Sequence, residues 1–375
     1  MKILFTGGGT AGHILPIIAV SREIRRLYQK ENLKLYYLGP NDDFTSILLS
    51  QEGIYIKTIL AGKIRRYPGI KSAFQNIFDV FFKIPLGILQ AFFIIFFTAP
   101  DLIFSKGGYG ALPPTIAGWI LRVPIFLHEA DVVPGLANRF LGRFAKEIFV
   151  SFPIKTTEHL PFKKMILTGN PIRREILQGD SQKAAEYSKL TREKPVILIL
   201  GGSQGAQRIN NVILEILPAL LADFEIIHQC GEKNFKQVSV EAKIMINKNM
   251  EKYYHLVPFL KEEELKNIYA ASQIIVSRAG ASSIFEIAAL GKPSILIPLT
   301  EAAQNHQFKN AYAFAENGAS MVIEELNLTP RFFLEKLKFL ISRPDEMEKM
   351  RQAALEFAKP NAARIIAEYI LGYLI

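Results

Sequence analysis

Short runs of aliphatic and β-branched residues alternate along this chain with longer segments in which apolar positions recur at helical spacing. Such alternation is typical of parallel sheets whose strands are joined by crossover helices, and it predicts an α/β fold. Residues 353–374 have the pattern of a closing helix. We expect strands near residues 2–6, 34–38, 101–104, 124–127 and 147–150, and again near 195–200, 224–228, 253–257, 273–277 and 294–298.

Two of these strands run into glycine turns that precede apolar helical patterns, at Gly7–Gly12 and at Gly201–Ala206. Glycine lets the backbone approach a ligand closely, and the next helix offers unpaired N–H groups and a positive dipole end to an anion. A phosphate or diphosphate is the expected ligand, although each turn alone could equally be a tight connection without one. The spacing excludes a P-loop and departs from the full dinucleotide-binding fingerprint.

The repetition of this unit predicts two Rossmann-like, doubly wound parallel-sheet domains facing a cleft. A length of 375 residues suits two domains, each with its own core. We expect the first domain at residues 1–163 and the second at residues 164–354, because Gly169-Asn170-Pro171 marks a turn near the change. A helix at about 355–375 is expected to pack back on the first domain.

Composition and charge indicate the cellular compartment and the kinds of partner that the protein could bind. The single cysteine, Cys230, excludes a disulfide framework within the chain and favours a reducing compartment. No secretory signal precedes the first glycine turn, so we expect a cytoplasmic location. Residues 1–164 carry 20 Lys and Arg against 11 Asp and Glu, whereas residues 165–375 carry 25 against 24. A basic first half is typical of proteins that bind nucleic acid or an anionic membrane surface.

A phenylalanine-rich segment, residues 74–97, decides between these partners because it holds eight of the 27 phenylalanines. Polar and helix-breaking residues interrupt it, so it is not expected to span a membrane, and Pro85 predicts a break. We expect residues 74–86 to contact an anionic membrane, with a partner protein as the alternative, and residues 88–97 to form a core helix. The chain shows no interleaving of aromatic and basic residues typical of a nucleic-acid groove, so a nucleic acid partner is not expected. Four basic residues precede the segment: Lys63, Arg65, Arg66 and Lys71.

Polar side chains follow the predicted strands at the edge where parallel sheets bind ligands. His13 comes after the first glycine turn, where the helix dipole lowers the imidazole pKa, so it is a candidate base or merely a hydrogen-bonding group at the helix start. The carboxylates of His128-Glu129-Ala130-Asp131 could also take a proton from a hydroxyl. Glu286 could bind a diol such as a ribose, or could only complement a helix dipole. A fourth polar group is Gln304–Asn310.

The order and spacing of these motifs resemble the MurG family, the peptidoglycan N-acetylglucosaminyltransferases that make lipid II from lipid I. The resemblance extends from the first strand to beyond residue 311. It rests on Gly7-Gly8-Gly9-Thr10-Ala11-Gly12-His13 with Pro16, Gly107-Gly108-Tyr109, His128-Glu129, Gly169-Asn170-Pro171-Ile172-Arg173, Gly201-Gly202-Ser203-Gln204-Gly205-Ala206, Arg278-Ala279-Gly280 with Glu286, and Asn305-His306-Gln307 with Asn310-Ala311.

The resemblance implies a GT-B fold with the lipid-linked acceptor in the first domain and UDP-GlcNAc in the second. It implies inverting transfer of GlcNAc to the C4 hydroxyl of lipid I by a peripheral enzyme at the cytoplasmic face of the membrane. Such an enzyme serves cell-wall synthesis, cell shape and division, and other cell-wall synthesis proteins are candidate partners. The implied substrate-binding residues are Thr10, Ala11, Gly12, Asp131, Arg173, Ser203, Leu260, Ala281, Ser282, Ser283, Ile284, Phe285, Glu286 and Gln307.

The sequence departs from the family pattern at two places in these motifs. Ala11 stands where the family commonly has glycine, a small change if the residue keeps a negative φ. Asp131 stands where the family's His-Glu-Gln-Asn has an amide, so a carboxylate would face the donor diphosphate. This is electrostatically unfavourable unless Asp131 is protonated, paired or turned toward the acceptor. Asp131 is therefore itself a candidate base.

Attack of the acceptor hydroxyl on C1 of the donor sugar needs a base and a stabilised UDP leaving group. His13 is the expected base, with Asp131 and Glu129 as rivals, while helix N-termini, Arg173 and the Ser203 turn would stabilise the diphosphate. No metal-binding motif is evident, and neither a metal nor a cofactor is expected. The alternatives are a GT-B glycolipid synthase with a diacylglycerol acceptor, a nicotinamide-dependent oxidoreductase, and a non-catalytic, membrane-docked protein that binds UDP-sugar.

Overall fold

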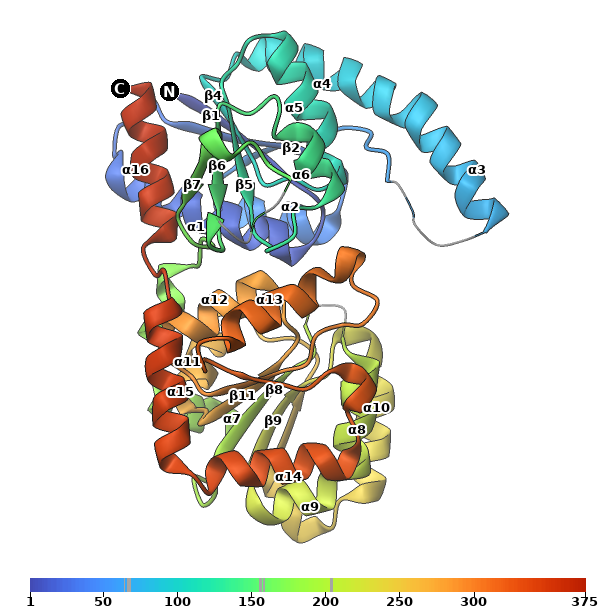
Figure 1. Ribbon diagram of the computed structural model, residues 1–375, viewed down its shortest axis with the longest axis vertical. Helices are drawn as coiled ribbons and strands as arrows, with labels where there is room; N and C mark the ends of the chain where they lie inside the picture. Colours follow the sequence, from blue (N-terminus) through green and yellow to red (C-terminus); the bar gives the residue numbers. More distant parts are fainter. Residues whose placement is uncertain (64, 66–68, 155–156, 158, 203–204) are drawn as a thin grey trace. The chain divides into compact units, whose positions relative to one another are not determined.

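The structure is a computed structural model that describes the chain except residues 64, 66–68, 155–156, 158 and 203–204 (Figure 1). The contacts within the chain divide it into two units. The first unit comprises Met1–Arg173 with Pro360–Ile375, and the second comprises Arg174–Lys359. Each unit is built on its own parallel sheet, so the predicted α/β class with two parallel-sheet domains is confirmed.

The first unit contains a seven-stranded sheet in the order β3-β2-β1-β4-β5-β6-β7. The chain builds outward from β1 in one direction and then from β4 in the other, so the topological switch point lies between these two strands. Five strands match the predicted ones, whereas β3 and β7 are additional. The strands are β1 (Lys2–Thr6), β2 (Lys34–Gly39), β3 (Tyr55–Thr58), β4 (Leu102–Ser105), β5 (Ile125–Glu129), β6 (Glu147–Val150) and β7 (Met165–Leu167).

The first unit extends to Arg173 rather than to residue 163, because β7 pairs with β6 in its sheet. The helix predicted over residues 353–374 is two helices, since Pro360 lies between them and lacks an amide hydrogen. The later one packs on α1 in the first unit. The helices around this sheet are α1 (Ala11–Leu27), α2 (Asp43–Gln51), α5 (Leu112–Ile120), α6 (Leu136–Leu141) and α16 (Ala362–Leu374).

A long helical arm, formed by α3 (Ile70–Phe78), the π-helical segment η1 (Asp79–Lys83) and α4 (Ile84–Thr98), belongs to the first unit (Figure 1). The break predicted at Pro85 is wrong. The N–H of Ile84 donates to the Asp79 carbonyl five residues back, and this wider turn accommodates a proline in the first turn of α4. Within the described residues, Phe74–Thr98 is the one helix long and apolar enough to cross a membrane by length and composition. The polar and helix-breaking residues of this segment therefore interrupt the helix less than the sequence predicted.

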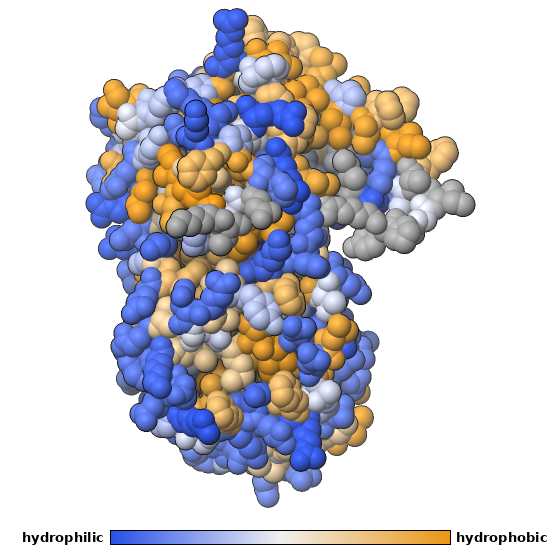
Figure 2. Space-filling model, in the orientation of Figure 1, coloured by the Kyte–Doolittle hydropathy of each residue, from blue (hydrophilic) through white to orange (hydrophobic). Residues whose placement is uncertain are grey.

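The two faces of the arm differ in their exposure to solvent. Gly87, Ala91 and Ile95 are buried on the face where α4 packs against α5. The core helix expected at residues 88–97 is correct for this face alone. The other face is apolar and exposed, as part of Figure 2 shows, through Phe74, Ile77, Phe78, Phe81, Phe82, Leu86, Leu89, Phe93, Phe96 and Phe97.

The second unit contains a six-stranded sheet in the order β10-β9-β8-β11-β12-β13. Its five predicted strands are present, and β13 is additional. The strands are β8 (Val196–Leu200), β9 (Glu225–Gln229), β10 (Tyr254–Val257), β11 (Ile274–Ser277), β12 (Ser294–Leu296) and β13 (Met321–Val322). The helices are α7 (Ser181–Ser188), α8 (Gln207–Glu215), α9 (Leu217–Asp223), α10 (Glu232–Met245), α11 (Glu262–Ala271), α12 (Ala281–Ala289), α13 (His306–Ala315), α14 (Pro330–Ile341) and α15 (Pro344–Phe357).

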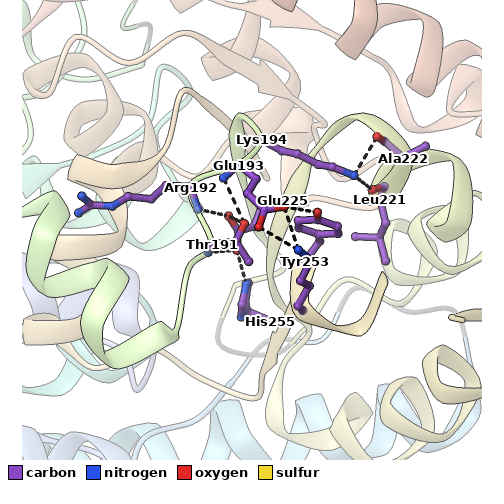
Figure 3. A network of polar contacts seen from close by, with 10 residues as sticks. Thr191, Arg192, Glu193, Lys194, Leu221, Ala222, Glu225, Tyr253 and His255 are labelled. Carbon is purple, nitrogen blue, oxygen red and sulfur yellow. Dashed lines mark hydrogen bonds and ion pairs between the residues drawn. The ribbon is translucent and has the colours of Figure 1, made fainter. Parts of the chain in front are cut away.

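Glu225, the first residue of β9, anchors the N-terminal edge of this sheet (Figure 3). Its buried carboxylate accepts hydrogen bonds from Thr191 N (2.8 Å), Thr191 Oγ1 (3.1 Å) and Arg192 N (3.1 Å). His255 Nε2 lies 2.8 Å from the same carboxylate. This edge is opposite to the one where parallel sheets bind ligands, so the network serves stability rather than chemistry.

Candidate functional site

The C-terminal ends of β1, β4 and β5 are neighbours at the switch point of the first sheet, and they carry the candidate catalytic residues. Thr10 is the N-cap of α1, and its Oγ1 lies 2.8 Å from His13 Nδ1. The imidazole lies against two glycines. A Cβ on Gly8 would be 3.2 Å from His13 Nδ1, and one on Gly108 would be 3.0 Å from Nε2. Side chains at those two positions would crowd the ring.

His13 is held neutral in this position. Burial, together with the positive charge of Lys106, lowers the pKa of His13 to about 4, although Asp131 acts in the opposite direction. The sequence predicted a lowered pKa from the helix dipole alone, whereas the structure adds desolvation and a nearby lysine. An imidazole with this pKa is unprotonated across the physiological range.

Lys106 is the charged residue of this edge that the sequence analysis missed. It directly follows β4, and its side chain is buried. Burial lowers the pKa of Lys106 to about 8, while the charges of Glu129 and Asp131 oppose this shift. The only signal in the sequence was a lysine between a buried strand and Gly107-Gly108, in a motif singled out for its glycines.

Glu129 is the last residue of β5 and is buried. Its carboxylate accepts hydrogen bonds from Asp131 N (3.0 Å), Gly135 N (3.3 Å) and Asn138 Nδ2 (2.8 Å). Burial, reinforced by the charge of Asp131, raises the pKa of Glu129 to about 7. Because two of these donors belong to the loop after β5 and the third to α6, Glu129 is placed to hold that loop against α6, and Asp131 is the more accessible carboxylate.

The second unit presents the N-terminus of α12, which begins after the N-cap Gly280. Ala281, Ile284 and Phe285 are buried in the core, so only their backbones could meet a ligand, while Ser282 and Ser283 are partly exposed. A Cβ on Gly280 would meet no atom within 4 Å, and the approach to the helix end is open at this point.

Other residues predicted to bind the sugar donor also belong to the second unit. Glu286 is buried, and Tyr269 Oη donates a hydrogen bond to its Oε2 (3.1 Å). Gln307 Oε1 accepts a hydrogen bond from Leu299 N (3.1 Å), which fixes the orientation of its amide. Leu260 is buried after β10.

The predicted catalytic and binding residues belong to both units. Arg173 is buried at the end of the first unit, and Ser203 lies outside the described residues. Thr10, His13, Glu129 and Asp131 share the edge of the first sheet with Ala11 and Gly12, whereas Leu260, Ala281–Glu286 and Gln307 belong to the second unit. In the part of the chain that the structure describes, no group of three or more His, Cys, Asp or Glu side chains could hold a metal ion.

Comparison with known families agrees with this arrangement. Residues 3–150 match the N-terminal domain of glycosyltransferase family 28, and residues 196–366 match its C-terminal domain. The two parallel-sheet units and the family match define a GT-B glycosyltransferase, a hexosyltransferase by class.

Curated relatives and a solved structure identify the family more closely. Proteins of Bacillus cereus and Clostridium tetani are 38% and 37% identical to this chain, each over 98% of it and over 99% and 98% of their own lengths. Both are named as UDP-N-acetylglucosamine–N-acetylmuramyl-(pentapeptide) pyrophosphoryl-undecaprenol N-acetylglucosamine transferases. The crystal structure of Acinetobacter baumannii MurG is 25% identical, covers 99% of both chains and has a TM-score of 0.72. The chain belongs to the MurG family.

Proposed function

We propose that this chain transfers N-acetylglucosamine from UDP-GlcNAc to the C4 hydroxyl of undecaprenyl-diphospho-MurNAc-pentapeptide, lipid I, and so makes lipid II. The observation that carries the proposal is the similarity over 98% of the chain to curated N-acetylglucosamine transferases. The edge of the first sheet supports it, because a neutral imidazole beside an anion-binding glycine turn suits removal of a hydroxyl proton next to a diphosphate. The product belongs to peptidoglycan synthesis.

The test is transfer of radiolabel from UDP-GlcNAc into a short-chain lipid I analogue by the purified protein. We expect labelled lipid with this acceptor and none with diacylglycerol. Transfer to diacylglycerol alone would instead identify a glycolipid synthase. Binding of UDP-GlcNAc without transfer to either acceptor would identify a non-catalytic protein that binds UDP-sugar.

We infer that His13 is the base. The attacking oxygen must lose its proton as it bonds to C1, and a neutral imidazole can accept that proton. If Nδ1 carries the hydrogen and donates it to Thr10 Oγ1 over 2.8 Å, the lone pair of Nε2 is left for the acceptor. Glu129 is less suited, because donors from the loop after β5 and from Asn138 of α6 occupy its carboxylate.

The lowered pKa of His13 predicts an unusual acid limb in the pH profile. A base works only when unprotonated, so kcat/KM should fall as pH falls through the pKa of the imidazole in the free enzyme. We expect the fall near pH 4, the value to which burial and Lys106 lower the pKa of His13, rather than near the unperturbed 6.5. Titration of the imidazole by NMR, assigned with His13→Gln, measures the same pKa directly. A midpoint above pH 6 by both methods would contradict this assignment.

We infer that the second unit binds the donor at the N-terminus of α12. Unpaired N–H groups and the helix dipole favour a phosphate there, and the buried carboxylate of Glu286, oriented by Tyr269, suits the hydroxyls of a ribose. The proposed substrate contacts are Thr10, Ala11, Gly12, Asp131, Arg173, Ser203, Leu260, Ala281, Ser282, Ser283, Ile284, Phe285, Glu286 and Gln307.

We infer further that the helical arm docks the protein on the cytoplasmic face of the membrane, with other cell-wall synthesis proteins as candidate partners there. The exposed phenylalanines on its outer face support docking in an interface, since such a large apolar face is unfavourable in water. The one buried acid of the arm, Asp79, is neutralised by Arg65 (2.7 Å) and Lys83 (2.8 Å). The basic residue Arg66 lies outside the described residues.

Removal of apolar area from the arm is expected to weaken membrane binding. In the triple variant Phe78→Ser, Phe81→Ser and Phe82→Ser, three side chains that are 51%, 69% and 56% exposed no longer enter the interface. The partition coefficient onto vesicles with anionic lipid should fall about a hundredfold, as measured by co-sedimentation. The matched control is Val240→Ser with Ile244→Ser on α10, where exposed apolar residues are removed from the second unit. Equal binding of all three proteins would contradict docking through the arm.

A further inference from the structure

His228 on β9 is a buried histidine of the second unit and is not one of the proposed substrate contacts. Both of its ring nitrogens have a polar partner. Nδ1 lies 2.9 Å from Tyr254 Oη of β10, and Nε2 lies 3.0 Å from Asn210 Oδ1 of α8. The histidine therefore connects two neighbouring strands to the helix that follows the second glycine turn.

The direction of each hydrogen bond in this chain of contacts is fixed. Asn210 Nδ2 donates to the carbonyl of Cys230 (3.0 Å), so its Oδ1 faces the imidazole as an acceptor. Burial lowers the pKa of His228 to about 3, so at physiological pH the ring is neutral and carries a hydrogen on only one nitrogen. That nitrogen is Nε2, because only a donor can satisfy Asn210 Oδ1, and Tyr254 therefore donates to Nδ1.

The chain of hydrogen bonds ends on the carbonyl of Cys230, and the second glycine turn lies directly against that carbonyl. A Cβ on Gly205 would fall 2.7 Å from Cys230 O and 2.2 Å from Asn234 Nδ2, which also donates to Cys230 O (3.0 Å). Glycine allows this close approach at a φ of +77°. Gly201 N donates to the Gln229 carbonyl (2.9 Å), so the described residues at both ends of the turn rest on the end of β9.

Asn210 also fixes the beginning of α8. Its backbone N–H donates to the carbonyl of Ala206, the N-cap of this helix (2.9 Å), while its side chain reaches the end of β9. A phosphate bound at the turn would meet the unpaired N–H groups of this helix end. Hydrogen bonds weaken steeply when their geometry departs from the optimum, so the placement of these groups decides how tightly a diphosphate is held.

We propose that His228 is a positioning residue for the donor. By donating to Asn210 it holds the amide on the Cys230 carbonyl, and it thereby sets the second glycine turn and the N-terminus of α8 where they receive the diphosphate of UDP-GlcNAc. Tyr254 acts one step further back, because its hydroxyl keeps the ring hydrogen on Nε2. The inference rests on the proposed binding of UDP-GlcNAc by the second unit.

Calorimetry with UDP tests the proposal on His228→Asn and His228→Gln. The amide nitrogen of glutamine is as many bonds from Cβ as Nε2 of histidine, so glutamine can still donate to Asn210, whereas the shorter asparagine cannot. We expect the dissociation constant for UDP to rise at least about tenfold in His228→Asn and to stay within about threefold of the wild type in His228→Gln. KM for UDP-GlcNAc should rise in parallel, while KM for the lipid I analogue and the affinity for uridine, which lacks the diphosphate, should not change.

Two adjacent tyrosines give a matched pair of variants. Tyr254→Phe removes the hydroxyl that donates to His228, so the ring can move its hydrogen to Nδ1 and lose the bond to Asn210. Tyr253→Phe removes the hydroxyl that donates to Glu193, in the network at the N-terminal edge of the sheet (Figure 3). The affinity for UDP should fall about threefold or more in Tyr254→Phe and stay unchanged in Tyr253→Phe, whatever the urea midpoints of the two variants.

The results that would overturn this inference differ from those that would refute the transfer. Unchanged UDP affinity in His228→Asn, an equal loss in His228→Gln, or an equal loss in Tyr253→Phe would overturn it. NMR of the isotopically labelled imidazole reads the tautomer in the wild type, and a hydrogen on Nδ1 would overturn it too. A wild type that binds UDP but transfers nothing would refute the proposed reaction and leave the inference standing, whereas one that does not bind UDP would refute the donor site and the inference together.

Discussion

Replacement of His13 by alanine is expected to lower kcat by about 10²- to 10⁴-fold, the range that a general base contributes. The substitution removes the imidazole that lies between Gly8 and Gly108 at the start of α1. Alanine suits a helix, so the fold should persist. The affinity for UDP-GlcNAc, measured by calorimetry, should change little, because the proposed nucleotide contacts belong mainly to the second unit.

The matched variant is Thr10→Val, which keeps the imidazole but removes the hydroxyl 2.8 Å from its Nδ1. It should lower kcat less than His13→Ala does, because the ring loses its orientation but not its basicity. Near-normal turnover by His13→Ala would show that the base lies elsewhere. Asp131 would then be the first candidate, since it is the more accessible carboxylate of the same edge.

Most of the strands that the sequence predicted have buried side chains, such as β1, β4 and β8, whereas β10 is a partly exposed edge strand. Continuous apolar runs are a strong signal for strands covered on both faces. The missed strands β3, β7 and β13 are short, lie at or near the edges of the sheets, and carry partly or fully exposed residues. Their pairing is decided by neighbouring strands and leaves little trace in the local sequence.

The arm illustrates a different limit of sequence reasoning. Asp79 and Lys83 counted as polar interruptions, but they lie one turn apart and form an ion pair of 2.8 Å. Arg65, which is distant from Asp79 in sequence, completes the neutralisation at 2.7 Å. A linear pattern records the charges and not their pairing, so it underestimated how continuous the helix is.

The sequence predicted those residues of the candidate site that directly follow a strand or a glycine turn. The glycine turn after the first predicted strand led directly to His13, and the end of the strand predicted at residues 124–127 led to His128-Glu129-Ala130-Asp131. The burial of Lys106 was not predictable, because lysine is usually exposed and its burial depends on residues far away in the sequence, such as Gly7. The burial of His13 itself and the charge of Lys106 explain why the pKa of His13 falls further than a helix dipole would produce.

Replacement of Gly107 by alanine should strongly destabilise the first unit. Gly107 has a φ of +78°, which is unfavourable for alanine, and its Cβ would fall 1.8 Å from Asn138 Oδ1. Asn138 cannot move away freely, because its Nδ2 donates to Glu129 (2.8 Å). The combined strain and overpacking should lower the free energy of unfolding by about 3 kcal/mol or more.

Urea unfolding monitored by circular dichroism measures this change, and Gly135→Ala is its control in the facing loop. Gly135 has an ordinary φ of −60°, and a Cβ there would meet no atom within 4 Å. Its backbone N–H, which donates to Glu129 Oε2 (3.3 Å), is retained in alanine. The control should therefore be as stable as the wild type. Equal stability of Gly107→Ala would mean that Asn138 of α6 does not pack against the turn after β4 as the structure has it.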